Sequence, residues 1–413
     1  MNTHPNITLT AGETALVEAL GASANPAAAV TAEKIRARGL PTRRVEPWHY
    51  TDLRSLLKAF PGVEGEWGAQ VDLPQLIDSF VITFANGSHV EGELANLPEG
   101  ISGTASNSDM APPEGVVIEA DTIGDINRAL SANGVSLTVA DRAKVAKPVS
   151  LVHLAAGGAS QVLTHQVVVG EDAEAVFLDR NHSSVEENHQ NIVTNLAVGR
   201  NAKVTWLVDQ ELDTATDRLA QLNVHLAEGA DLQLLILNAG GRLVRQEVHV
   251  AVRGAGANLD IKGVNLIGKD AHIDVTTTLA HEEPETTSTE TFRNVALADG
   301  NGVFQGQIRV ARIAQKTDAR MACNTLLLSD AADFSAKPEL EIFADDVQCA
   351  HGATVTDIEE DHLFYLRARG IPEREARALL VKAFVEEVFE DLDYEALSEV
   401  LTTRIENWLD RNG

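Results

Sequence analysis

Cysteine is scarce in this chain of 413 residues, which contains only Cys323 and Cys349. Two cysteines cannot build a disulfide framework, so the fold must depend on its apolar core. Aromatic residues are also few, at 4%, whereas apolar residues make up 44% of the sequence. We therefore expect a core of many small aliphatic contacts. Free thiols suit a reducing compartment, and we predict a cytoplasmic protein.

Basic residues are outnumbered by acidic ones, 33 to 61, which gives a formal net charge of −28. No basic stripe is visible, so the sequence indicates neither nucleic-acid binding nor an anionic membrane surface. No run of about 20 apolar residues occurs, so no transmembrane helix is expected. The first residues, Met1 to Pro5, lack the basic start and apolar segment of a secretory signal.

Motifs of common enzyme classes are absent as well. The sequence has no Gly-x-x-x-x-Gly-Lys-Ser/Thr phosphate loop and no Gly-x-Ser-x-Gly nucleophile turn. Gly254 and Gly256 form a Gly-x-Gly pair, but they are not followed by the helical pattern that a dinucleotide site requires. We therefore predict that the protein is not an enzyme.

The first 149 residues mix helical and extended patterns. We predict an N-terminal helical region, 1–79, whose Trp48 and Tyr50 anchor it to the rest of the chain. A mixed α/β connecting region, 80–149, follows. In it we expect a strand from Phe80 to the turn Asn86-Gly87, a loop over 92–115, a helix over 121–133 and a strand over 135–149.

A repeated unit dominates residues 150–355. Apolar strand patterns meet at glycine-containing turns, and the turn glycines Gly170, Gly199, Gly229 and Gly256 lie 29, 30 and 27 residues apart. Glycine permits a left-handed backbone at such corners. A constant period without a helical pattern between copies predicts a β-helix, in which strands stack on those of the next coil. A β-sandwich is the alternative, but it would lack the constant period.

Polar residues along this repeat are expected to lie on solvated loop faces. A Thr-rich stretch, Thr286 to Thr291, is expected to form a threonine ladder between stacked strands. Histidine and glutamate groups match no metal-ligand spacing that we can defend. These groups are His182 with His189, and His272 with His281, Glu282 and Glu283.

After Val355 the pattern becomes helical and predicts a C-terminal helical domain, 356–413. Thr356 and Glu359 have the spacing of a capping box, and Gly370 with Pro372 separates two helices. A last helix carries an apolar face. This domain would cover an edge of the β-helix. The last apolar face comprises Leu397, Val400, Leu401, Ile405 and Trp408.

Cys349 and His351 are the candidate ligands of the chain. They lie two residues apart in a strand pattern, so their side chains should point to the same side. A thiolate and an imidazole suit a soft or borderline metal, but two donors do not close a site. The alternative is that Cys349 is a small buried residue and His351 a hydrogen-bonded surface histidine.

The segment around these two residues resembles the C-terminal signature of the SufB/SufD family of iron–sulfur cluster assembly scaffolds. The N-terminal block Trp48-x-Tyr50-Thr51-Asp52-Leu53 is more similar to the SufD branch. The matching C-terminal blocks are Pro338-Glu339-Leu340-Glu341-Ile342, Cys349-x-His351-Gly352-Ala353-Thr354 and Leu363-Phe364-Tyr365-Leu366-x-x-Arg369-Gly370-Ile371, preceded by Gly306-Gln307-Ile308-Arg309-Val310, Gln315-Lys316-Thr317-Asp318-Ala319 and Leu326-Leu327-Leu328-Ser329-Asp330.

The resemblance implies a right-handed parallel β-helix and a non-catalytic scaffold. It implies a heterodimer with the paralogue SufB through the β-helix, and the ATPase SufC bound by the C-terminal helices. His351, and after it Cys349, would be interfacial ligands for iron or a nascent, transient iron–sulfur cluster. The isolated chain could form a homodimer. Alternatives are a β-helix carbohydrate-active enzyme, or a homodimeric adaptor without cluster chemistry.

Cys323 departs from the family pattern, which usually has arginine at that position. It lies 26 residues before Cys349, close to one period of the repeat. This spacing suggests that the two cysteines are stacked neighbours on adjacent coils. A buried and inert Cys323 is the alternative.

Overall fold

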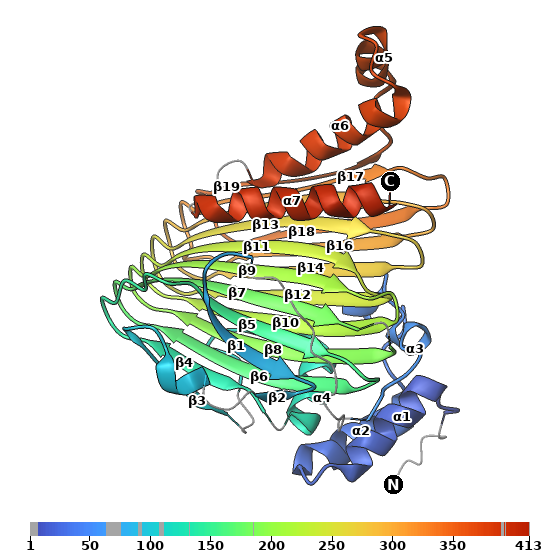
Figure 1. The fold of residues 1–413 in the computed structure, drawn as a ribbon. Coiled ribbons are helices and arrows are strands. Elements are labelled where there is room, and N and C mark those ends of the chain that lie inside the picture. The colour runs from blue at the N-terminus through green and yellow to red at the C-terminus, as the bar shows by residue number, and fades with distance from the viewer. Residues whose placement is uncertain are drawn as a thin grey trace.

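The computed structural model describes residues 7–62, 76–89, 93–106, 111–131, 133–184, 186–389, 392 and 394–412. In these ranges two stacked β-sheets form the body, with helices at both ends of the sequence (Figure 1). Residues Met1 to Pro5, interpreted above for the absence of a secretory signal, lie outside the described residues.

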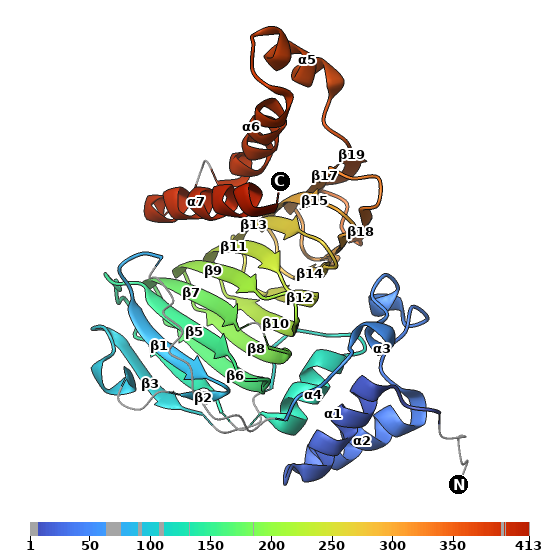
Figure 2. The same cartoon turned by 45° about the vertical axis from the view of Figure 1, so that its right-hand side comes forward.

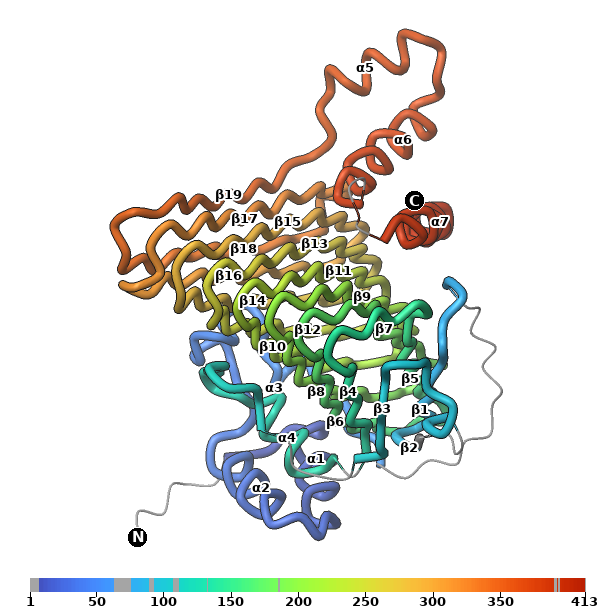
Figure 3. The backbone as a smooth tube through the Cα atoms, turned by 90° about the vertical axis from the view of Figure 1, so that its left-hand side faces the viewer, coloured from blue at the N-terminus to red at the C-terminus, as the bar shows by residue number. Residues whose placement is uncertain are grey.

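The two sheets arise because consecutive strands alternate between them. From β5 onwards each odd-numbered strand joins sheet A and each even-numbered strand joins sheet B. Neighbouring strands in a sheet are parallel and one coil apart, as for Leu234 beside Ile261 and Glu290 beside Met321. The predicted parallel β-helix is therefore confirmed, with about eight turns (Figure 3). The β-sandwich alternative is wrong.

The ends of the two sheets differ. At the N-terminal end β1 pairs with β2, and β3 with β4, as antiparallel hairpins, and Asn86 and Gly87 have the positive φ expected of the β1–β2 turn. At the other end β18 and β19 are the last strands. Sheet A contains β1 (Phe80–Ala85), β2 (Ser88–His89), β5 (Val149–Ala155), β7 (Glu174–Ser183), β9 (Lys203–Leu212), β11 (Asp231–Gly240), β13 (Asn258–Ile267), β15 (Thr287–Ala296), β17 (Asp318–Leu327) and β19 (Gln348–Thr356). Sheet B contains β3 (Ile101–Ala105), β4 (Val135–Val139), β6 (Ser160–Val169), β8 (Asn188–Val198), β10 (Thr216–Leu226), β12 (Leu243–Val252), β14 (His272–His281), β16 (Asn301–Val310) and β18 (Asp333–Ile342).

The main core lies between the sheets, because alternate side chains of every strand point inward. Aliphatic rows fill most of this space, as the composition predicts. One inward row of sheet A is polar instead. Asn238 donates to Asn265 at 2.8 Å, and Asn265 donates to Asn294 at 2.7 Å. These side-chain bonds link consecutive coils and hold their register.

The corners confirm only part of the expectation for glycine. Gly229 and Gly256 have positive φ, at 61° and 69°. In the two preceding coils the left-handed residues are Asp172 and Asn201. Gly199 is needed there for close approach, since a Cβ would lie 2.7 Å from the Val169 carbonyl oxygen.

The N-terminal helices cover the outer face of sheet B. Their apolar side chains pack against Leu219 and Leu243 of this face. Trp48 is fully buried and stacks on Arg245, with 4.0 Å between the guanidinium carbon and the ring centre, so its predicted anchoring role is confirmed. Tyr50 is half-buried. The helices on this face are α1 (Ala11–Ala22), α2 (Pro26–Arg38), the short η1 (Glu46–Trp48), α3 (Leu53–Leu56) and α4 (Thr122–Leu130). The short η2 (Glu93–Asn96) instead contacts β1 and β3, and its Leu94 packs against the main core.

The C-terminal helix and the short helical turn before it cover the outer face of sheet A. The apolar face of α7 (Glu395–Asn412) is buried as predicted, and it packs against side chains such as Leu235 and Val264. The other helices are α5 (Glu360–Ala368), α6 (Glu373–Glu386) and η3 (Glu387–Phe389). Among the helices described here, none combines the length and apolar character needed to cross a membrane. The division into 1–79, 80–149, 150–355 and 356–413 stays a prediction, although β1 and β4 already belong to the two sheets.

The prediction of solvated histidines is wrong. His189 and His281 are fully buried in β8 and β14, and His272 retains only 8% of its exposure. His182 is half-buried in β7. Burial lowers the pKa of His189 to about 3 and that of His281 to about 4, so both remain neutral.

Three local predictions also differ from the structure. The loop expected over 92–115 contains η2 and β3, because β3 pairs with β4. Helix α5 has no capping box, since Glu359 occupies its N-cap without a side-chain bond. The threonine ladder is limited to one pair just before β15, in which Thr286 bonds to Thr317 of the next coil at 3.1 Å, and it does not extend through the strand. Thr289, for example, lies between Asp260 and Arg320.

Candidate functional site

The C-terminal end of the β-helix is open. β19 and β18 are the edge strands of sheets A and B, and each pairs on one side only among the described strands. Apolar side chains lose their cover here, with Ile342 41% and Val355 43% exposed. An open edge with apolar side chains is a surface suited to strand pairing with another chain.

Cys349 and His351 lie on β19, at this open end. Cys349 pairs in register with Ala319 and His351 with Met321 of β17, whose side chains are both buried in the main core. The two candidate ligands therefore continue inward-facing rows of sheet A. Because no coil follows in the described chain, His351 is exposed and Cys349 is half-buried. The structure brings them to one face of one strand.

The thiol of Cys349 is protonated at neutral pH. Burial is the largest influence and raises the pKa of Cys349, the backbone of Ala319 opposes it, and the Asp318 carboxylate raises it further. A metal must therefore displace the thiol proton, whereas a neutral imidazole binds through a free nitrogen. Within the described residues no group of three or more His, Cys, Asp or Glu side chains could hold a metal ion. The pair supplies two donors.

Cys323 is not a neighbour of Cys349, so the stacking prediction is wrong. It pairs with Ala353, four residues further along β19 than Cys349. Its side chain is fully buried and accepts a hydrogen bond from Asn294 at 3.3 Å. Burial raises the pKa of Cys323 to about 12. This thiol is inert, as the alternative interpretation states.

The two edge strands differ in their backbone hydrogen-bonding capacity. Gln348 donates its N–H to Thr317 of the neighbouring coil, so the even-numbered residues of β19 face β17. The odd-numbered residues point their N–H and C=O groups outward. In β18 the N–H of Phe343 bonds to Val310, so the even-numbered residues point outward, and these include Pro338. The free edge of β18 lacks a donor at its centre, whereas that of β19 is complete from Cys349 to Val355.

Helices α5 and α6 project away from the body beyond the open end (Figures 1 and 2). Phe364 and Tyr365 on α5 are 72% and 57% exposed. Ion pairs fasten the following helices to sheet A. Arg404 contacts Asp209 at 3.0 Å, and Arg293 contacts Glu387 at 2.9 Å. Helices α5 and α6 together are called the C-terminal arm. The arm therefore exposes aromatic rings, and the helices that follow it are held to sheet A by ion pairs.

Comparison with known proteins decides the family. Residues 152–384 match the family model described as SUF system FeS cluster assembly, SufBD core domain. The chain belongs to the SufBD family. It is 30% identical to the iron–sulfur cluster assembly protein SufD of Escherichia coli, over 94% of each chain. It is 28% identical to the chloroplastic protein ABCI7 of Arabidopsis thaliana, over 87% of this chain and 81% of that protein.

A third relative is an iron–sulfur cluster assembly SufBD family protein of Synechocystis, which is 26% identical over 87% of this chain and 85% of that protein. This SufBD family member is accordingly an iron–sulfur cluster assembly protein. The resemblance to the family inferred from the sequence motifs, including the likeness to SufD, is confirmed.

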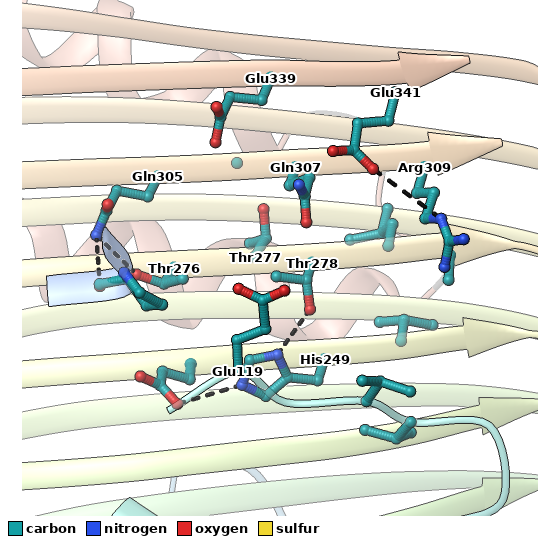
Figure 4. A pocket seen from close by; sticks show the side chains of 18 of the residues that line it. Glu119, His249, Thr276, Thr277, Thr278, Gln305, Gln307, Arg309, Glu339 and Glu341 are labelled. Carbon is teal, nitrogen blue, oxygen red and sulfur yellow. Dashed lines mark hydrogen bonds and ion pairs between the residues drawn. The ribbon is translucent and has the colours of Figure 1, made fainter. Parts of the chain in front are cut away.

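This SufBD protein also has a groove of about 460 Å³ on the outer face of sheet B (Figure 4). Much of its polar lining is bonded internally. His249 bonds to Thr278 at 2.7 Å and to Glu247 at 3.2 Å, and Gln305 contacts Thr276 at 3.4 Å. The groove therefore has a preorganised floor, and it lies away from the row that carries His351.

Sequence reasoning found the two donors but missed the features that make the end a site. Pro338 in a strand pattern is a signal for an edge strand, and it was available in the sequence. The register between β17 and β19 places Met321 next to His351 and leaves one edge of β19 unpaired. No local pattern indicates them.

Proposed function

We propose that this chain is a non-catalytic scaffold subunit of a Suf-type complex, which pairs end to end with a SufB-type paralogue and carries a SufC-type ATPase. The observation that carries the proposal is the open end of the β-helix. There an unpaired backbone edge and two side chains of types that can ligate a metal, Cys349 and His351, lie on the same strand. The role of the relatives in iron–sulfur cluster assembly supports this use of the end.

The partner strand is proposed to add to β19. Its outward N–H and C=O groups, from Cys349 to Val355, can form a complete ladder, whereas Pro338 interrupts the edge of β18. Adding a strand there would also bury the apolar end of the core. The side chains of Cys349 and His351 would then lie at the interface.

The cargo is proposed to be iron or a nascent cluster held between the two chains. His351 would contribute an imidazole nitrogen and Cys349 a thiolate, and the partner would complete the coordination. His351 is the stronger candidate, because Cys349 must first lose a proton whose pKa is raised by burial. Because each chain would supply only part of the coordination, the cargo would be bound transiently.

The ATPase is proposed to bind the arm formed by α5 and α6. Phe364 and Tyr365 give it exposed aromatic area, the kind of surface that interfaces prefer. The ion pairs Arg404–Asp209 and Arg293–Glu387 connect the base of this arm to sheet A. Movement of the ATPase would therefore act on the sheet that ends in β19.

A proline substitution tests the edge. Ala353→Pro removes an outward N–H from β19, and we expect loss of copurification with the SufB-type partner. Ala336→Pro is the matched control, because it removes an outward N–H from the edge of β18, which Pro338 already interrupts. Circular dichroism should be unchanged for both. Equal loss with both variants, or with neither, would contradict pairing through β19.

Replacement of His351 tests the cargo role. In the assembled complex we expect His351→Ala to lower the visible absorbance after reconstitution with iron and sulfide, while the subunits still copurify. Unchanged cluster formation in an intact complex would rule out ligation by His351. Cys323→Ala is a control that should not change cluster formation, since its thiol is buried away from the end.

The alternatives have their own tests. A homodimeric adaptor would copurify with no ATPase and would give no visible spectrum after reconstitution. A carbohydrate-active enzyme would show polysaccharide lyase or hydrolase activity. Family membership and the assembly relatives favour the scaffold. A cytoplasmic location is part of the same proposal, and cell fractionation tests it.

A further inference from the structure

Among the described residues, one glutamate lies inside the β-helix without a charged partner, two coils before the edge strand β19. Glu290 of β15 points inward between Ile261 of β13 and Met321 of β17, and its side chain is fully buried. Among the described residues no hydrogen bond of ordinary geometry reaches either of its carboxyl oxygens, and the polar group that lies close to them is the hydroxyl of Thr277 on the facing strand. The other buried carboxylates differ. Glu247, for example, bonds to Arg245 at 2.8 Å.

Within the described ranges no opposite charge compensates Glu290. The charged residues of the adjacent strands alternate to the outer face, and the titratable groups that remain nearby are neutral. Burial raises the pKa of Cys323 to about 12 and lowers that of His281 to about 4, so neither carries charge near neutrality. The facing strand β14 contributes the hydroxyl of Thr277, which is neutral. The charged residues on the outer face are Asp260 and Lys262 of β13, Arg293 of β15, and Asp318 and Arg320 of β17.

An unpaired carboxylate is strongly disfavoured in such surroundings, so the group takes up a proton instead. Burial raises the pKa of Glu290 from 4.5 to about 7, and the smaller influence of the Thr277 hydroxyl opposes it. The neutral form therefore prevails below neutrality and the anion above it. Since β17 and β19 stack on β15, any loosening caused by the anion reaches the open end.

We propose that Glu290 is a pH-sensitive switch that loosens the terminal coils of the β-helix, β15 to β19, when it ionises. This inference does not depend on the partner or the cargo. The unfolded chain releases the proton near pH 4.5 and the folded chain near pH 7, so stability falls as pH rises between these values and then levels off. Between pH 6 and pH 8 the folding equilibrium constant of these coils should fall about tenfold.

Hydrogen exchange on the full chain tests the switch. After correction for the intrinsic exchange rates, protection of β15, β17 and β19 should fall about tenfold from pH 6 to pH 8 in the unaltered protein. Glu290→Gln should make this protection independent of pH. Glu285→Gln is the matched control, because Glu285 is exposed in the same coil and pairs with Lys316 at 3.2 Å. It should behave like the unaltered protein.

A second variant keeps the test valid if Glu290→Gln does not fold correctly. Glu290→Met continues the row of Ile261 and Met321 with an apolar side chain, and it should also abolish the pH dependence. The unaltered protein alone can also overturn the proposal. If protection of these strands does not change between pH 6 and pH 8, the proposal is overturned. Persistence of the pH dependence in Glu290→Gln or Glu290→Met overturns it as well.

Discussion

The two cysteines show how strongly position alters one side chain. Cys323 and Cys349 lie on adjacent strands of sheet A, yet one is fully buried beneath the last coil and the other reaches the open end. Both thiols have raised pKa values because burial disfavours the thiolate. Only Cys349 combines a thiol with access to solvent, so it alone can exchange its proton for a metal or a reagent.

Thiol labelling should therefore find one reactive cysteine in the folded protein. We expect a maleimide or disulfide reagent to modify Cys349 and not Cys323, and the rate should continue to increase above pH 9, since the pKa is raised from its ordinary value of 9.0. Mass spectrometry of peptides identifies the site. Cys349→Ser should abolish labelling of the native chain and leave one thiol accessible in denaturant. Equal labelling of both cysteines would contradict the burial of Cys323.

Among the described elements, β19 and α5 expose backbone and aromatic groups at the open end of the β-helix. β19 offers backbone hydrogen bonds, and α5 offers aromatic rings at the tip of the C-terminal arm. An element that only capped the β-helix would turn its apolar residues toward the sheet, as α7 does with Trp408. Phe364 has the opposite orientation, which fits the docking role proposed for this helix.

Substitution of Phe364 separates docking from stability. Phe364→Ser should leave the melting temperature unchanged within about 2 °C, because substitutions of exposed side chains usually change stability by under 0.5 kcal/mol. Copurification with the SufC-type ATPase should nevertheless be lost. Val30→Ser, on the exposed face of α2 at 56% exposure, is the control and should retain the ATPase. If Phe364→Ser still copurifies with the ATPase, the ATPase does not bind through Phe364.

For the whole molecule, the net charge of −28 opposes association of two identical chains. A homodimer through β19 would join two strongly negative bodies, whereas a partner of different charge distribution would not meet the same repulsion. The apolar end and the free backbone edge still favour self-association when no partner is present.

Self-association of the isolated chain should therefore increase with salt. We expect light scattering to show more dimer at 0.5 M than at 0.02 M NaCl, because the screening length falls from about 20 Å to about 4 Å. Ala353→Pro should remain monomeric at both concentrations, whereas Ala336→Pro should follow the unaltered chain. A dimer that dissociates as salt is added would point to ion pairs in place of the β19 edge.

The sequence by itself determined the β-helix and the common orientation of Cys349 and His351. Stacked coils require similar lengths, so the glycine period is visible in the chain, and a strand places residues two apart on one side. The C-terminal motifs likewise determined the family. These features are local or periodic, and neither kind depends on knowing which coils are in contact.

The tertiary structure decided register, burial and exposure. The coil that separates Ala319 from Cys349 has 30 residues, not the 26 that would stack Cys323 on Cys349, because corner lengths vary from coil to coil. The same register buries His189 and His281, which looked like loop residues, and leaves Glu290 in the core without a partner. It also ends the sheets at β18 and β19. Each of these outcomes depends on which neighbour lies above or below a side chain, and only the stacking of coils fixes that neighbour.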